Sequence, residues 1–296
     1  MVLVGADRLT EGASAIARRF GVPEIVIGLT IVACGTSMPE FFVSLMSALN
    51  GTPDMAVGNV VGSNIMNAML IVGCAAVVAP MVISPSTVKK DIPFSVAASA
   101  LLIVLGIDTA IGRWDGAILL VGFAIFMAYT LWQTKGTKEE QPVESKPQSP
   151  WLSILWIILG LAGLVFGSNL FVDSASSVAA ELGVSQSVIG LTIVAGGTSL
   201  PELATSVVAA RKGQSAIAIG NVIGSNVFNI LLILGATAVI SPLQMEGITL
   251  LDMGVMMGSI TLVWLFSFTR YTVERWEGVA LIAGYGGYLG WLLSNV

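Results

Sequence analysis

Two glutamates, Glu40 and Glu202, lie inside long apolar stretches of the sequence, and each one closes a Thr-Ser-x-Pro-Glu motif. An ionisable side chain within a membrane costs roughly 2.5–3.5 kcal/mol on insertion scales, so one that is retained there usually serves a function. Either glutamate could instead pair with a lysine or cap a broken helix. Because no lysine or arginine lies at comparable depth in these stretches, we interpret both glutamates as functional.

The proline of each motif weakens the helix that carries the glutamate. Pro39 has no N–H to donate to the Gly35 carbonyl, and its ring crowds that carbonyl. Pro201 stands in the same position in the second motif. We therefore expect free carbonyl oxygens over Ala33–Ser37 and Ala195–Ser199, which a membrane tolerates only beside protein or a wet cavity.

Hydroxyl groups share a helix face with each glutamate. Thr36 precedes Glu40 by four residues and Ser37 precedes it by three, which places the three side chains on one side of a helix. The second motif repeats this arrangement with Thr198, Ser199 and Glu202. Each motif therefore offers a carboxylate, hydroxyls and backbone oxygens on one face.

A second polar stripe follows each motif on the next predicted helix. Its serines and asparagines are spaced i, i+4, and they are Ser63, Asn67, Ser225 and Asn229. Glycines at the same spacing, which let another helix approach closely, are Gly58, Gly62, Gly220 and Gly224. The remaining asparagines could hydrogen-bond between helices instead of contacting ions, and they are Asn59, Asn64, Asn221 and Asn226. The pattern predicts a closely packed cage of oxygens.

The ligands offered by these residues are all hard oxygens. Calcium takes six to eight such ligands and tolerates irregular geometry. Two glutamates neutralise one divalent cation, whereas three sodium ions would leave one positive charge uncompensated, so a three-for-one exchange would move net charge. The chain has no histidine, and we interpret its two cysteines, Cys34 and Cys74, as packing residues in apolar stretches. Copper and zinc sites are therefore not expected.

The elements that position these residues are expected to lie in a lipid bilayer. Of the 296 residues, 55% are hydrophobic and 10% are charged, and the mean hydropathy is +0.89. A soluble domain usually carries about 25% charged residues. The formal net charge of −5 offers no basic surface for nucleic acid. We expect neither a nucleic-acid partner nor an obligate protein partner.

About 20 apolar residues cross a bilayer as a helix, and on this criterion the sequence predicts ten spans. They lie near residues 1–20, 24–49, 56–79, 91–109, 115–133, 151–180, 186–210, 215–241, 248–268 and 276–294. The segment 134–150 reads TKGTKEEQPVESKPQSP and is too polar to fold by burying apolar surface. The expected organisation is an all-α membrane protein with five spans in residues 1–133, a polar linker at 134–150 and five spans in residues 151–296.

The positions of lysine and arginine predict the orientation in the membrane. The loops after the odd-numbered spans hold eleven of them: Arg18, Arg19, Lys89, Lys90, Lys135, Lys138, Lys146, Arg211, Lys212, Arg270 and Arg275. The opposite loops hold only Arg113, and Arg8 lies inside the first span. We therefore expect a multi-pass protein of the cell (inner) membrane with both termini outside and the linker in the cytoplasm.

The two halves of the chain repeat each other at a constant offset of 162 positions. VIGLTIVACGTSMPE (26–40) becomes VIGLTIVAGGTSLPE (188–202), and GNVVGSNIMN (58–67) becomes GNVIGSNVFN (220–229). Because five spans is an odd number, the second copy enters the membrane from the opposite side. Inverted repeats of this kind are typical of secondary transporters, which bind substrate near the midplane between the repeats. Met1 aligns with Gly163, so the first span is expected to be shorter than the sixth at its N-terminus.

At these motifs the sequence resembles the calcium/cation antiporter superfamily, specifically its prokaryotic sodium/calcium exchanger branch. The paired GTS-x-PE and GN-x-x-GSN-x-x-N blocks match the alpha repeats of that family, and the resemblance covers nearly the whole chain. It implies an antiporter that exchanges sodium for calcium without a cofactor, with the second, third, seventh and eighth spans around the ions. It also implies that the first and sixth helices slide across this core to alternate access.

The resemblance further implies a role for individual residues. Glu40 and Glu202, with the carbonyls of Thr36 and Thr198, would surround calcium. Sodium would lie near both glutamates and near Ala33, Ser37, Ser63, Ala195, Ser199 and Ser225. Asn67 and Asn229 would line the centre. Some members have aspartate at the position of Asn229, and its absence here argues against a potassium-cotransporting subtype.

Three alternatives to sodium/calcium exchange make different demands on the sequence. Buried glutamates can carry protons, so a proton/calcium antiporter is the main alternative, and uptake driven by a pH gradient alone would identify it. A passive cation channel would need an open pathway and no counter-ion. An intramembrane enzyme would need a nucleophile–base pair or an aspartyl dyad, and without histidine or a paired GxGD-like motif we expect no enzymatic activity.

Overall fold

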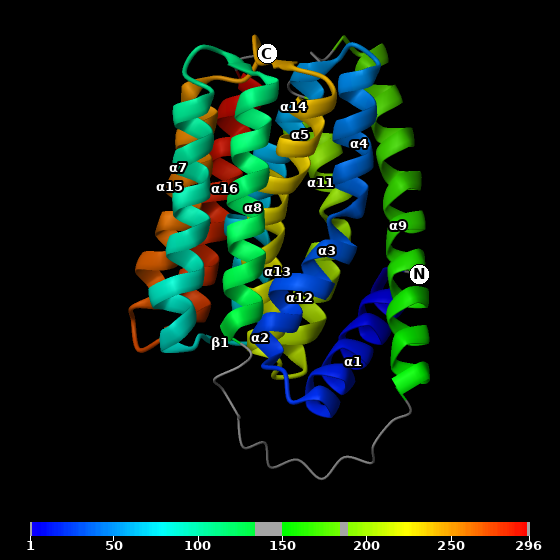
Figure 1. Cartoon of the computed structure of the whole chain (residues 1–296), viewed down its shortest axis with the longest axis vertical. Coiled ribbons are helices and arrows are strands. Elements are labelled where there is room, and N and C mark those ends of the chain that lie inside the picture. The colour runs from blue at the N-terminus through cyan, green and yellow to red at the C-terminus, as the bar shows by residue number, and fades with distance from the viewer. Residues whose placement is uncertain (1, 134–149, 184–188, 295–296) are drawn as a thin grey trace.

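Helices that run along the long axis of the molecule make up almost all of the structure (Figure 1). The computed structural model describes residues 2–133, 150–183 and 189–294, so the predicted linker lies outside the described residues except for Pro150. Each of the ten predicted spans is helical over most of its described residues.

The bounds of the elements follow the repeat. In the first half the helices are α1 (Val2–Phe20), α2 (Glu24–Ile27), α3 (Ala33–Thr36), α4 (Met38–Leu49), α5 (Pro53–Met66), α6 (Val72–Val78), α7 (Ile92–Leu105) and α8 (Arg113–Gln133). In the second half they are α9 (Pro150–Glu181), α11 (Ala195–Thr198), α12 (Leu200–Arg211), α13 (Ser215–Val227), α14 (Gly235–Ile240), α15 (Leu250–Ser267) and α16 (Arg275–Ser294). Within the part of the chain that the structure describes, five π-helical segments adjoin some of these helices: η1 (Gly28–Val32), η2 (Asn67–Ile71), η3 (Thr87–Asp91), η4 (Gly190–Val194) and η5 (Phe228–Leu234). The bounds of η1, α3 and α4 recur in η4, α11 and α12 at the offset of 162.

Both Thr-Ser-x-Pro-Glu motifs break their helix at the serine. Ser37 has φ −82° and ψ 6°, and Ser199 has φ −83° and ψ 5°. The helical segments on the two sides of the break differ in direction by 45° in the first half and by 47° in the second. A proline in the first turn after each break needs no N–H partner, so a new helix begins there without penalty. The predicted interruption of these two spans is confirmed.

The two halves pack into each other. In the centre, α13 contacts α2 and η1, while α5 contacts η4 and α11. Glycines make the approach close: a Cβ added at Gly220 would lie 3.1 Å from the Gly28 Cα, and one added at Gly224 would lie 2.6 Å from the Ala33 Cβ. The predicted glycine ridge of α13 therefore meets the broken helix of the first half at the level of its backbone.

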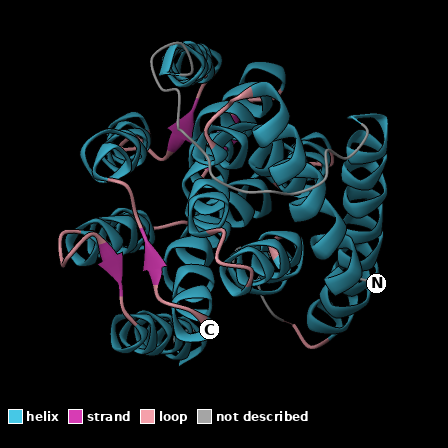
Figure 2. Cartoon of the chain, turned by 90° about the horizontal axis from the view of Figure 1, so that it is seen from below, coloured by secondary structure: helices cyan, strands magenta, loops and turns pink. Residues whose placement is uncertain are grey.

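Two pairs of short antiparallel strands also join the halves. β1 (Met81–Val82) pairs with β4 (Thr272–Val273), and β2 (Ala110–Ile111) pairs with β3 (Leu243–Gln244). Figure 2 shows both pairs on the side of the molecule away from the N-terminal helix. They connect the loops of the outer helices α7, α8, α15 and α16 to the loops that follow α6 and α14.

The helices α1 and α9 form an antiparallel pair at one side of the molecule (Figure 1). A Cβ at Gly5 would lie 2.7 Å from the Gly160 carbonyl oxygen, and one at Gly12 would lie 2.6 Å from the Ser153 carbonyl oxygen. Small residues therefore let the two backbones touch. α1 has 19 residues and α9 has 32.

Within the described residues, four helices are long and apolar enough to cross a membrane, and two bent pairs pass the same test when each pair is taken as one span. The four are Pro53–Val78, Arg113–Trp132, Ser215–Ile240 and Leu250–Ser267. Large apolar side chains cover the outer surface, among them Val104, Val121, Ile125 and Leu265, each more than half exposed. The structure is therefore that of a helical membrane protein.

Candidate cation site

The two glutamates meet at the centre of the molecule through hydrogen bonds that cross between the halves. Ser199 Oγ donates to Glu40 Oε1 over 3.0 Å, and Ser37 Oγ donates to Glu202 Oε1 over the same distance. Both carboxylates are fully buried. Each glutamate stands in the first turn of the helix that follows a break, where the helix N-terminus favours negative charge. The sequence prediction that the motifs come together is confirmed by these contacts.

The serines of the next helices contact the same groups, but in different ways. Ser225 Oγ donates to Glu202 Oε1 over 3.2 Å, whereas Ser63 Oγ reaches the Ala195 carbonyl oxygen at 3.5 Å. The Ala195 carbonyl belongs to the stretch before the break in the second half. Ser63 and Ser225 therefore both line the site, although the repeat is not exact at this point.

Two asparagines tie the threonines of one half to the glutamate helix of the other. Thr198 Oγ1 donates to Asn59 Oδ1 over 3.0 Å, and Asn59 Nδ2 donates to Ser44 Oγ and to the Glu40 carbonyl oxygen. Thr36 Oγ1 donates in the same way to Asn221 Oδ1 over 3.0 Å. The threonine hydroxyls thus link the two halves beside the glutamate helices.

Asn221 completes the mirrored set by donating through Nδ2 to Ser206 Oγ over 3.0 Å and to the Glu202 carbonyl oxygen over 3.4 Å. Sequence reasoning missed both partner serines, Ser44 and Ser206. A signal existed, because each lies four residues after its glutamate and the two occupy matching positions of the repeat.

Four asparagines meet between α5, η2, α13 and η5. Asn67 Nδ2 donates to Asn226 Oδ1 and Asn229 Nδ2 donates to Asn64 Oδ1, both over 3.0 Å, while Asn64 Nδ2 donates to the Asn226 carbonyl oxygen over 3.2 Å. The interpretation of Asn64 and Asn226 as residues that bond between helices agrees with these contacts. Asn67 and Asn229 keep their side-chain oxygens free of a donor.

The chemistry of the site follows from its unpartnered atoms. Among the buried side-chain oxygens without a hydrogen-bond donor are Glu40 Oε2, Glu202 Oε2, Asn67 Oδ1 and Asn229 Oδ1. A buried acceptor without a partner is costly, and a buried carboxylate costs far more. The ion pairs formed by the described residues, Arg8–Glu11 and Asp7–Lys212, involve neither glutamate. Buried oxygens that lack donors and lysine partners are suited to a hard cation.

A helical membrane protein whose two similar halves enclose one buried set of oxygens has the architecture of a secondary cation transporter. The sequence pattern of the sodium/calcium exchanger protein family matches residues 1–132 and 152–294. The chain therefore belongs to this family, and the resemblance inferred from its motifs is confirmed.

Relatives and a solved structure agree with this assignment. The putative antiporter CaxA of Alkalimonas amylolytica is 37% identical over all of this chain and 96% of its own length. The sodium/calcium exchanger MaX1 of Methanosarcina acetivorans is 33% identical over 96% of this chain and 93% of its own. A crystal form of the sodium-calcium exchanger NCX_Mj soaked with Na+ and Ca2+ superposes with a TM-score of 0.83 at 33% identity, covering 98% of this chain and 94% of that one.

Proposed function

We propose that this chain is a secondary antiporter that exchanges sodium for calcium across a membrane by alternating access, with Glu40 and Glu202 binding both ions in turn. The observation that carries the proposal is the reciprocal pair of hydrogen bonds from Ser199 to Glu40 and from Ser37 to Glu202, which joins one carboxylate from each half in one buried site. Membership of the sodium/calcium exchanger family supports the choice of ions. Because the two ions would use overlapping ligands, binding of one excludes the other, and exchange follows.

The proposed ligands divide between the ions. Calcium would take both glutamates and the carbonyls of Thr36 and Thr198. Sodium would take both glutamates with the oxygens of Ala33, Ser37, Ser63, Ala195, Ser199 and Ser225, and the centre would be lined by Asn67 and Asn229. Each threonine hydroxyl donates to an asparagine of the other half, which holds the threonine backbone beside the site.

The proposal includes ten transmembrane helices arranged as two inverted repeats. The recurrence of η1, α3 and α4 at a fixed offset supports the repeat. The distribution of lysine and arginine supports an inner membrane protein with both termini outside and residues 134–150 in the cytoplasm. Labelling of single cysteines placed in that segment, in intact cells and in inverted vesicles, tests the orientation. Labelling from the outside of intact cells would contradict it.

The direct test of function is uptake of radioactive calcium into sodium-loaded proteoliposomes. We expect uptake that requires the outward sodium gradient, and a loss of about a hundredfold in Glu40→Gln, because removing one of two charges around a divalent ion in a buried site costs several kcal/mol. Glu246→Gln is the matched control, since Glu246 lies exposed in a loop. Uptake that ignores the sodium gradient, or that a pH gradient alone drives, would overturn the proposal in favour of the proton antiporter.

A further inference from the structure

The contacts of the α1–α9 pair with the rest of the molecule are not symmetric. α1 packs along α12, whereas the corresponding pair in the repeat, α9 and α4, touches at few positions. A transporter built from inverted repeats reaches its second access state when the two halves exchange their arrangements. The structure therefore represents one of two related states, in which α1 is held against α12.

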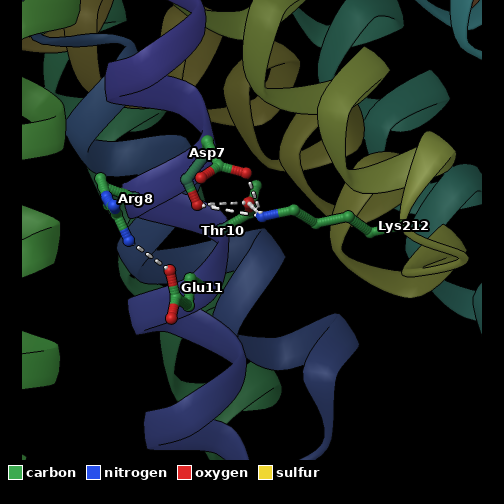
Figure 3. Close-up of polar contacts among 5 residues, drawn as sticks. All are labelled: Asp7, Arg8, Thr10, Glu11 and Lys212. Carbon is green, nitrogen blue, oxygen red and sulfur yellow. Dashed lines mark hydrogen bonds and ion pairs between the residues drawn. The ribbon is translucent and has the colours of Figure 1, made fainter.

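A lysine makes a polar link between these helices. Lys212 follows α12, and its Nζ lies 2.6 Å from Asp7 Oδ1, 3.1 Å from the Asp7 carbonyl oxygen and 3.2 Å from Thr10 Oγ1 (Figure 3). An ammonium group has three hydrogens to donate, and here each has an acceptor on α1. Thr10 is fully buried, so one of the three acceptors is held within the packed helix interface.

The second ion pair of α1 does not cross between the two helices. Arg8 Nη1 lies 3.0 Å from Glu11 Oε2 on the same helix, and its guanidinium packs over the Trp156 ring of α9 at 4.3 Å (Figure 3 shows the pair). Of the Arg8–Glu11 and Asp7–Lys212 pairs, the Asp7–Lys212 bridge is the one that joins α1 to the end of α12.

The sequence repeat shows that this bridge has no charged counterpart. At the offset of 162, Lys212 corresponds to Asn50, Asp7 to Asn169 and Thr10 to Val172. If the halves exchanged arrangements, neutral or apolar side chains would stand where the bridge now stands. We propose that the Asp7–Lys212 bridge favours the access state with α1 against α12 over the opposite state; this inference rests on the alternating-access function proposed above.

The position of the bridge predicts which end of the molecule it keeps closed. Lys212 follows the end of α12, at the end of the molecule where α8 ends and α9 begins (Figure 1). Release of α1 from α12 therefore favours access from that end. Because both side chains are partly exposed, we expect a modest effect, about two- to fivefold in the equilibrium between the states.

The test uses variants that place the counterpart residue at each position: Asp7→Asn, Lys212→Asn and the double variant. In proteoliposomes of known orientation, the calcium concentration that half-saturates transport from the side of the bridge should fall about two- to fivefold. The reason is that apparent affinity scales with the fraction of protein in the state open to that side. Spin labels can be placed on Phe20 and Ser215 in a background without Cys34 and Cys74. In these variants, the fraction of molecules with the longer distance between the two labels should rise by a similar factor.

The double variant separates a direct bridge from two independent charge effects. If the two side chains act as a pair, the double variant should change the equilibrium no more than either single variant. Thr10→Val, which removes only a hydroxyl, should give a smaller shift in the same direction. Arg211→Asn removes a neighbouring exposed charge and should leave the equilibrium unchanged.

The outcomes distinguish this inference from the proposed function. If the unaltered protein shows no sodium-driven calcium uptake, the proposed function fails. If it exchanges the ions but Asp7→Asn and Lys212→Asn leave both the distances and the two half-saturation values unchanged, the bridge has no such role. Equal shifts in Arg211→Asn, or additive effects in the double variant, would also overturn it.

Discussion

At the scale of single residues, the hydrogen bonds of the site determine which oxygens are left for a cation. Thr36 and Thr198 donate their hydroxyls to Asn221 and Asn59, and the amide nitrogens of Asn67 and Asn229 donate to other asparagines. These bonds use donor hydrogens of the site, while the amide oxygens of Asn67 and Asn229 accept no hydrogen bond. The buried centre is consequently rich in lone pairs and poor in protons to donate, which is the condition that a desolvated cation requires.

The serines that donate to the opposite glutamates provide a prediction about sodium. We expect Ser37→Ala and Ser199→Ala each to raise half-saturating sodium about tenfold, since each removes one oxygen ligand worth about 1.4 kcal/mol. Calcium should be affected less, because its proposed ligands do not include these hydroxyls. Inhibition of calcium uptake by added sodium measures both values.

The two serine variants are controls for each other. Their contacts with the glutamates are equal in length, so they should have similar effects. A loss of calcium affinity as large as the loss of sodium affinity would contradict the proposed division of ligands.

Asn59 and Asn221 lead to a prediction about stability. Replacing Asn59 by alanine removes its bonds to Ser44 and Thr198 and to the Glu40 carbonyl. Hydrogen bonds within membrane proteins contribute about 0.6 kcal/mol on average and up to about 1.7 kcal/mol, so Asn59→Ala should lower the free energy of unfolding by about 2–4 kcal/mol.

Thermal unfolding in detergent measures this effect. Asn221→Ala should behave like Asn59→Ala, whereas Asn50→Ala, at an exposed position, should have little effect. Unchanged stability in both buried variants would mean that the asparagine links do not hold the halves together.

The sequence predicted the residues of the site better than their contacts. The repeat identified Glu40, Glu202 and their serines, because membrane-embedded polar residues at matching positions are rare and costly. It could not predict that Ser225 bonds to a carboxylate while Ser63 reaches a carbonyl, because residues alike in type and position differ there only in local packing.

At the scale of the elements, helix irregularities coincide with the proposed ligands. The segments η1 and η4 end directly before Ala33 and Ala195, η2 begins at Asn67, and η5 contains Asn229. π-helical turns within α-helices are frequent at functional sites, because they re-aim side chains and backbone groups. The prolines predicted the breaks at Ser37 and Ser199, but no residue pattern indicated the π-helical turns.

The short strands could not be predicted from the sequence either. Each strand has two residues, and each pair joins segments that are far apart in the chain, such as Met81–Val82 with Thr272–Val273. Two-residue segments carry no detectable alternation, and their pairing depends on where the helices place the loops.

The glycine ridge of α13 allows a prediction at this scale. An added Cβ at Gly220 would lie 2.9 Å from the Ile25 carbonyl oxygen and 3.1 Å from the Gly28 Cα, which are backbone atoms that cannot rotate away. We expect Gly220→Ala to destabilise the protein by about 1–3 kcal/mol through overpacking.

The control is Gly254→Ala on α15, where an added Cβ meets no atom within 4 Å. Because alanine favours a helix over glycine by about 1 kcal/mol, this variant should be neutral or slightly stabilising. Thermal unfolding of both variants separates the two cases. If Gly220→Ala and Gly254→Ala changed the stability equally, the stability of the protein would not depend on the close approach of α13 to the first half.

At the scale of the whole molecule, the two halves cannot act as independent units. α8 of the first half packs on α14, α16 of the second half packs on α6, and the strand pairs join the same halves again. The α1–α9 pair has no strand link among the described residues and touches the remainder by helix packing, the Ser14–Glu24 hydrogen bond and the Asp7–Lys212 bridge. This division favours movement of the pair against a body formed by the other helices.

The charge of the site gives a prediction for the whole transport cycle. Two glutamates balance one calcium ion, whereas three sodium ions in the same set of oxygens leave one uncompensated positive charge, so each three-for-one exchange carries one charge across the membrane. A potential of 100 mV acts on one charge with about 2.3 kcal/mol, which equals a factor of about 45 in the calcium gradient at equilibrium. With equal sodium on both sides, the entry of one calcium ion brings two charges in while three sodium ions carry three charges out, so an inside-positive potential drives calcium uptake. Proteoliposomes clamped by valinomycin and a potassium gradient should therefore accumulate calcium when the interior is positive and not when it is negative. Liposomes without protein provide the background, and a calcium distribution that does not respond to the sign of the potential would show that exchange is electroneutral and that the site binds only two sodium ions.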